Sequence, residues 1–226
     1  MNPIVLLHGA LGSTTQLHSL AEKFKSVGRE IFSFNFSGHG GTAFSGNEFG
    51  IDTFSKELLS FLDSQQIQRA DIFGYSMGGY VALWAAHLHP DRIGKMVTLG
   101  TKFDWTPESA EKDIRKLNPQ KIEEKVPSFA LTLKERHAPN DWREVLMKTA
   151  EMMKRLGQQP LLTEHILDQV KSPVHILLGD QDETVDLNFS KQVVTWLPFG
   201  KFVSLPNTPH PIEKVMSNFI IDAMLK

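Results

Sequence analysis

DIFGYSMGGYVALWAA, residues 71–86, begins as an apolar run typical of a buried strand and continues with a pattern typical of a helix. Ser76 stands at the junction, with Gly74 two residues before it and Gly78 two residues after it. This G-x-S-x-G pattern, between a strand and a helix, is typical of a nucleophile elbow, a strained turn that holds a serine hydroxyl above a sheet. Side chains two residues from the serine would collide with such a turn, which explains the glycines. A compact strand-to-helix crossing without a chemical role is the alternative interpretation.

Strand and helix patterns alternate along most of the chain. Apolar, β-branched or aromatic runs predict strands at 4–7, 30–36, 70–76, 95–100, 174–179 and 201–205. Helical spacing lies between them, for example at 17–28, 51–67 and 188–197, and again in the C-terminal IEKVMSNFIIDAML. This alternation predicts an α/β fold with a mostly parallel sheet and helices on both faces.

Residues 102–170 interrupt the alternation. They contain helical patterns such as ESAEKDIRKL, PSFALTLKERH and WREVLMKTAEMMKRL but no strand pattern, and prolines divide them into short helices. We therefore expect one structural domain, with a core formed by 1–101 and 171–226 and a helical cap inserted at 102–170.

Composition excludes several classes of function. The formal net charge of −2 leaves no basic surface for nucleic acid or an anionic membrane. The chain has no cysteine, which excludes disulfides, thiolate metal sites and a cysteine nucleophile. The N-terminal MNPIVLLHG lacks the features of a signal peptide, and no apolar stretch reaches transmembrane length. We expect a cytoplasmic protein that does not insert into membranes.

A serine hydroxyl is a poor nucleophile at neutral pH, so it needs a base, and the base needs an acid that orients it. Asp182 follows a predicted strand in the stretch Gly179-Asp180-Gln181-Asp182, and His210 follows the last predicted strand. Both residues are therefore expected at the carboxyl ends of strands, where open α/β sheets build their sites. Of the nine histidines, only His210 has the chain position that the order serine, acid, histidine requires.

From residue 4 to the C-terminus, the chain resembles the α/β-hydrolase superfamily. His8-Gly9, the serine elbow, the G-D-x-D stretch and the late histidine occur in that family's order. The resemblance implies that Asp182 is the catalytic acid, with Asp104 as the alternative. It also implies an oxyanion hole formed by the backbone N–H groups of Met77 and Ala10, with Leu11 as a substitute for Ala10. The family commonly has two strands before the one that leads to His8-Gly9. They are missing here, so we expect a sheet of about six strands.

The expected reaction is hydrolysis of a small carboxylic ester or thioester through an acyl-enzyme intermediate, without a cofactor or metal. Apolar side chains in the cap predict a substrate with a largely apolar acyl part. Candidate substrate contacts are Leu11, Tyr75, Phe103, Trp105, Phe129 and Trp142. The same triad in related proteins also serves C–C bond hydrolases, lyases and cofactor-free perhydrolases, and the fold also serves ligand-binding receptors. These remain alternatives, and the sequence predicts no oligomeric state.

Overall fold

Six parallel strands form a single sheet in the order β2-β1-β3-β4-β5-β6. The computed structural model describes residues 1–46 and 48–226. The strands are β1 (Ile4–Leu7), β2 (Ile31–Ser33), β3 (Ala70–Tyr75), β4 (Ile93–Leu99), β5 (Val174–Gly179) and β6 (Gly200–Leu205). The predicted α/β fold with a six-stranded parallel sheet is confirmed, and each predicted strand is present.

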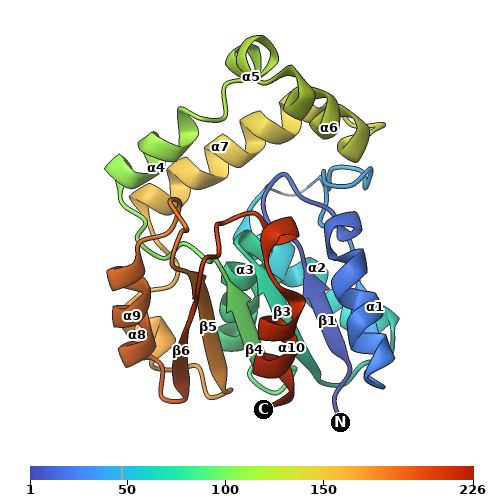
Figure 1. Cartoon of the computed structure of the whole chain (residues 1–226), viewed down its shortest axis with the longest axis vertical. Coiled ribbons are helices and arrows are strands. Elements are labelled where there is room, and N and C mark those ends of the chain that lie inside the picture. The colour runs from blue at the N-terminus through green and yellow to red at the C-terminus, as the bar shows by residue number, and fades with distance from the viewer. Residues whose placement is uncertain (47) are drawn as a thin grey trace.

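Helices cover both faces of the sheet (Figure 1). One face packs against α1 (His18–Ser26) and α10 (Ser217–Leu225), and the other packs against α2 (Ile51–Ser64), α3 (Met77–Leu88) and α9 (Leu187–Trp196). Side chains of β1 alternate between these layers, with Ile4 and Leu6 on the first and Val5 and Leu7 on the second. This two-residue period is the expected consequence of a pleated strand buried on both faces.

Residues 102–170 form a helical segment between β4 and β5. Its helices are α4 (Pro107–Ile114), α5 (Pro119–Lys125), α6 (Pro127–His137), α7 (Trp142–Gln158) and α8 (Glu164–Leu167). In Figure 1, α4 to α7 form a layer above the carboxyl ends of the strands. Three of these helices begin at a proline, because proline has a fixed φ suited to the first helical turn and lacks only an N–H that would be unpaired there.

Two predicted elements are shorter than their patterns suggest. The run 30–36 yields a strand only at Ile31–Ser33, because the next amides bond elsewhere: the N–H of Phe36 donates to Nε2 of His8 (3.2 Å), and that of Ser37 donates to Glu57 (3.0 Å). The C-terminal helical pattern divides into a short 3-10 turn, Ile212–Lys214, and α10, separated by extended backbone at Val215 and Met216.

A helix that crosses a bilayer needs about twenty mostly apolar residues. Within residues 1–46 and 48–226, none of the helices is both long enough and apolar enough for this.

Candidate active site

Ser76 occupies the turn between β3 and α3. Its backbone is left-handed, with φ 51° and ψ −115°, which is unusual for a residue with a side chain. The neighbouring strand and the residues after it hold Ser76 in place. The N–H of Ser76 donates to the carbonyl of Leu99 (2.8 Å), and the carbonyl of Ser76 accepts from the hydroxyl of Thr101 (2.9 Å). Strain of this kind persists only where surrounding contacts impose it, and it is concentrated at functional sites.

The glycines of the motif are required by close backbone packing. A Cβ at Gly78 would lie 2.5 Å from the carbonyl oxygen of Leu7 and 2.8 Å from that of His8. A Cβ at Gly74 would overlap the backbone of the first turn of α3. The start of α3 therefore packs directly on β1, which places Ser76 beside the loop that follows His8.

Asp182 and His210 meet at the carboxyl ends of β5 and β6. Nδ1 of His210 lies 2.7 Å from Oδ2 of Asp182, whose side chain is only 2% exposed. The other oxygen, Oδ1, accepts the N–H groups of Thr184 (2.8 Å) and Val185 (3.1 Å). Both carboxylate oxygens are thus hydrogen-bonded, so the aspartate is fixed in position. Because a carboxylate oxygen can only accept, the hydrogen of a neutral His210 imidazole lies on Nδ1. Nε2 is then left as the basic nitrogen.

His210 also lies against residues that neighbour Ser76. The hydroxyl of Tyr75 donates to the carbonyl of His210 (3.2 Å), and their rings lie 5.5 Å apart between centroids. Gly100, with φ 60°, follows β4, and a Cβ there would come within 3.2 Å of the His210 ring. The histidine is therefore packed between the residue before the serine and the strand next to it.

The alternative acid, Asp104, has different partners. Its Oδ2 lies 3.7 Å from Nζ of Lys102, and burial raises the pKa of its carboxyl despite that lysine. Thr106 caps α4, because its side chain accepts the N–H of Ser109 (3.1 Å). The structure thus brings Asp182, rather than Asp104, to His210.

The loop after β1 contributes the third part of the arrangement. A Cβ on Gly9 would lie 3.1 Å from Cβ of Ser76, so the loop passes directly beside the serine. Leu11 has a left-handed backbone (φ 58°), and its carbonyl accepts from Arg136 (2.8 Å) and lies 3.2 Å from Nε2 of His137. Two side chains of α6 therefore hold this loop. Met77 begins α3, and the first N–H groups of a helix have no acceptor within the helix.

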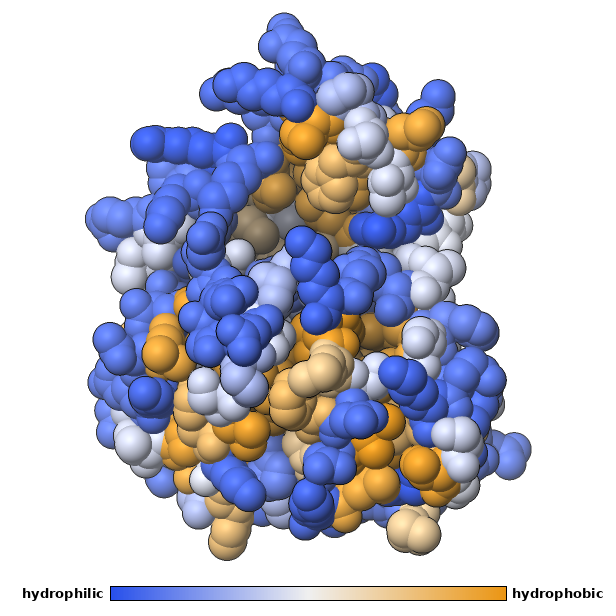
Figure 2. All heavy atoms as spheres, viewed as in Figure 1, coloured by the Kyte–Doolittle hydropathy of each residue, from blue (hydrophilic) through white to orange (hydrophobic). Residues whose placement is uncertain are grey.

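A cavity of about 200 Å³ opens beside Ser76, between the sheet and the helical segment. Figure 2 shows hydrophobic side chains set back among hydrophilic ones where these two layers meet. The lining includes Ala10, Ile51, Ser76, Met77, Tyr80, Lys102, Trp105, Asp113, Lys116, Leu117, Met152, Met153, Leu156 and Thr184. It combines apolar side chains with one group of charged residues.

The structure separates the predicted substrate contacts. Trp105 lines the cavity, whereas Leu11 packs against the apolar cluster of α5 to α7, and Tyr75 packs against His210. Three other candidates lie outside the lining of this cavity. Phe103 is buried in the main core, Trp142 packs with Leu133 and Leu146 inside the helical segment, and Phe129 is 40% exposed on α6. An apolar side chain at helical spacing does not reveal which of these surroundings it has.

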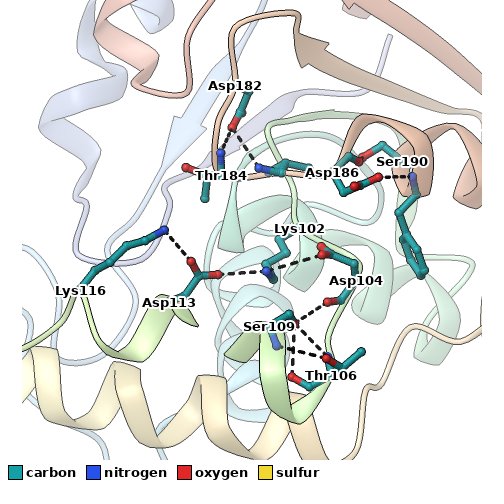
Figure 3. Close-up of polar contacts among 12 residues, drawn as sticks. Lys102, Asp104, Thr106, Ser109, Asp113, Lys116, Asp182, Thr184, Asp186 and Ser190 are labelled. Atoms are coloured by element: carbon teal, nitrogen blue, oxygen red, sulfur yellow. Dashed lines mark hydrogen bonds and ion pairs between the residues drawn. The ribbon is translucent and has the colours of Figure 1, made fainter. Parts of the chain in front are cut away.

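The charged group was not foreseen from the sequence. Asp113 on α4 accepts from Nζ of Lys116 (2.8 Å) and from Nζ of Lys102 (3.0 Å), as Figure 3 shows. Two features of the sequence could have indicated this group: Lys102 lies just after β4, and Asp113 and Lys116 have i, i+3 spacing. Similar charged pairs, however, occur on many solvated helix surfaces.

Three buried histidines connect the helical segment to the body of the protein. The ring of His39 lies between those of His8 (5.0 Å) and His137 (5.7 Å). Nε2 of His8 accepts the N–H of Phe36, and Nδ1 of His137 accepts the N–H of Gly40 (3.2 Å), so each ring is neutral. Burial lowers the pKa of His8 and of His137 to about 4 and lowers that of His39 as well.

Comparison with known proteins identifies the family. The family model described as alpha/beta hydrolase fold matches residues 2–160. The chain belongs to this family. An sn-1-specific diacylglycerol lipase of Danio rerio is 31% identical over 98 residues, which are 43% of this chain and 31% of the lipase. Esterase YbfF of Escherichia coli is 33% identical over 98 residues, 43% of this chain and 38% of the esterase. The matches thus span about a third of these relatives.

Solved structures of other proteins share the whole fold at low sequence identity. NosK of Streptomyces actuosus has a TM-score of 0.84 at 18% identity, over 99% of this chain and 96% of that chain. The enol-lactonase of Burkholderia xenovorans has a TM-score of 0.77 at 16% identity, over 100% and 92%. These likenesses describe the fold and leave the reaction of this chain to be argued from its own site.

Proposed function

We propose that this alpha/beta hydrolase is a serine hydrolase that cleaves a small carboxylic ester or thioester through an acyl-enzyme intermediate. The observation that supports the proposal best is the 2.7 Å contact between His210 and the buried carboxylate of Asp182, beside a strained serine elbow. In this arrangement Asp182 orients the imidazole and stabilises its protonated form, and His210 serves as the base.

In the acylation step, the hydroxyl oxygen of Ser76 forms a bond to the substrate carbonyl carbon, while its proton passes to Nε2 of His210. The carbonyl oxygen becomes an oxyanion, which the backbone N–H groups of Met77 and Ala10 bind. The tetrahedral intermediate then collapses: the bond to the alcohol or thiol breaks, and His210 returns the proton to the leaving group.

Deacylation repeats the same steps with water. His210 takes a proton from the water as its oxygen attacks the ester carbon on Ser76. The bond to Ser76 then breaks, the serine regains its proton, and the free acid leaves. No group besides the protein and water is needed for the balance of atoms and charge.

We further propose that the helical segment 102–170 acts as a cap over Ser76. The cavity is bounded on one side by Ala10 and Met77 and on the other by Met152, Met153 and Leu156 of α7. Such an enclosure suits an acyl chain of limited size, because the cavity has a volume of about 200 Å³.

Hydrolysis of 4-nitrophenyl hexanoate tests the proposal. The protein is expected to release nitrophenol with saturation kinetics, and Ser76→Ala is expected to reduce kcat by at least 10³-fold while the fold, measured by circular dichroism, is unchanged. Equal rates for the two proteins would contradict the proposal. Saturable binding of the ester with background turnover in both would indicate a receptor instead.

A further inference from the structure

Lys102, Asp113 and Lys116, which we call the lysine cluster, form a charged group on the wall of the cavity that contains Ser76 (Figure 3). Lys102 follows β4, and its side chain is 11% exposed, with Nζ 5.1 Å from the centre of the Trp105 ring. Lys116 follows α4 and is 55% exposed. The cluster therefore extends from the buried part of the cavity towards solvent.

Burial of charge in this largely apolar wall is costly unless the charge has partners or a function. Both oxygens of Asp113 are bonded by lysines. Burial raises the pKa of this carboxyl, but the bonds from Lys116 and Lys102 outweigh it and hold the pKa below its usual value. Asp113 is therefore ionised and already paired, which disfavours a cationic ligand.

Ammonium donors remain available in the cluster. Two lysines have six N–H donors, and three contacts are formed with carboxylates: two with Asp113 and a longer one, 3.7 Å, from Lys102 to Asp104. Asp104, at 3.7 Å, is the more distant of the two carboxylates that face Lys102. The wall of the cavity thus offers donors to an anion beside a surface suited to methylene groups.

We propose that the lysine cluster binds a carboxylate at the far end of the substrate's acyl chain. This inference rests on the proposed function, because it assigns the preferred substrate as an ester or thioester of a dicarboxylic acid. The apolar lining, including Met152, Met153 and Leu156, contacts the chain between the two carboxyl groups. Lys102 and Lys116 neutralise the terminal charge, which would otherwise lose its hydration on entry.

The test compares two esters that differ at one end only. The 4-nitrophenyl monoester of adipic acid has a carboxylate where 4-nitrophenyl hexanoate has a methyl group. We expect the protein to have at least tenfold higher kcat/KM for the adipate ester, and Lys116→Met to abolish this preference by lowering kcat/KM for the adipate ester more than for hexanoate. Lys112→Met, on the exposed face of α4, is the matched control and should retain the preference. Lys102→Met should act like Lys116→Met if it folds.

A second measurement separates this inference from the proposed function. Calorimetry with free adipate and Ser76→Ala should detect binding that Lys116→Met removes in the same background, whether or not any ester is hydrolysed. Efficient hydrolysis of hexanoate without a preference for adipate, and without adipate binding, would overturn the inference and leave the proposed function intact. A preference that instead follows charge on the leaving group, seen with hexanoyl-coenzyme A, would also overturn it.

Discussion

The backbone of Ser76 is strained, and this strained conformation fixes the position of the side-chain hydroxyl. A side chain at φ 51° costs about 1 kcal/mol or more, and the contacts from Leu99 and Thr101 offset that cost. The same turn leaves the hydroxyl at the end of β3, next to the loop after β1 and near the residues that pack against His210. The chemistry proposed here depends on that geometry more than on any property of serine itself.

Removal of the charge on the proposed acid gives a prediction at this scale. Asp182→Asn retains an oxygen for the N–H groups of Thr184 and Val185 but no longer stabilises a protonated His210. We expect kcat with 4-nitrophenyl hexanoate to fall by on the order of 10⁴-fold with little change in KM.

Two variants control this prediction. Asp186→Asn should have normal activity, because asparagine caps α9 as well as aspartate does. Asp104→Asn should reduce kcat less than tenfold. If Asp104→Asn instead reduced kcat as strongly as Asp182→Asn, the assignment of the acid would be wrong.

The glycines of the elbow give a second prediction. Gly78→Ala places a Cβ 2.5 Å from the carbonyl oxygen of Leu7, so α3 must shift away from β1. We expect a loss of roughly 3 kcal/mol in the free energy of unfolding, measured by urea denaturation. Gly46→Ala has nothing within 4 Å of the new Cβ and should change stability by less than 1 kcal/mol. Similar stability of the two variants would show that the close packing is not as described.

At the scale of elements, α6 is joined to the loop beside the serine. Arg136 and His137 both contact the carbonyl of Leu11, next to the proposed oxyanion donor Ala10. The helical segment therefore also holds the backbone of the loop to which we assign the oxyanion donor.

Loss of one of these contacts should affect the transition state more than substrate binding. We expect Arg136→Met to lower kcat about tenfold with less than a twofold change in KM, because the loop then relaxes away from its strained conformation. Arg115→Met, at an exposed position after α4, should leave both constants unchanged. A change in KM alone would mean that Arg136 contributes to binding rather than to positioning.

At the scale of the whole molecule, the buried histidines link stability to pH. In the folded state the pKa of His8 and of His137 is about 4, against 6.5 for an unperturbed side chain, so the unfolded chain binds more protons between these values. The free energy of unfolding is therefore expected to rise with pH across this window and to fall as pH decreases from about 6.5 to 4. Each histidine changes the free energy of unfolding by about 3 kcal/mol at most.

Urea denaturation between pH 4 and 7 measures this dependence. His137→Gln should reduce the slope of the free energy of unfolding against pH. His165→Gln, at an exposed position, should leave that slope unchanged. The nearby cation, Arg136, acts in the same direction, because its charge disfavours protonation of His8 and His137. A stability that is constant over this range would contradict the neutral, buried state assigned to the cluster.

The sequence predicts the sheet well, because strands buried on both faces, such as Ile4–Leu7 and Val174–Gly179, are continuous apolar runs between clear breaks. It also predicts that Ser76, Asp182 and His210 each follow a strand of one parallel sheet, which places them at the same edge of that sheet. It does not predict the lining of the cavity. Whether Trp105 or Trp142 faces the cavity depends on how α4 to α7 pack on one another, and both positions are equally apolar in the sequence.

The sequence does not predict the lysine cluster, for a related reason. Lys102 and Asp113 are eleven positions apart, and their pairing depends on the direction in which α4 leaves the sheet. The three histidines come from three distant segments, and only the folded chain shows that their rings lie side by side.

Covalent labelling of Ser76 tests the central claim most directly. A fluorophosphonate probe reacts with a serine only when a neighbouring base activates it and donors stabilise the adduct. Intact mass measurement should show one adduct, peptide mapping should place it on Ser76, and Ser76→Ala and His210→Ala should stay unmodified. Folded protein that remains unlabelled, or that is labelled equally after either substitution, would contradict the account.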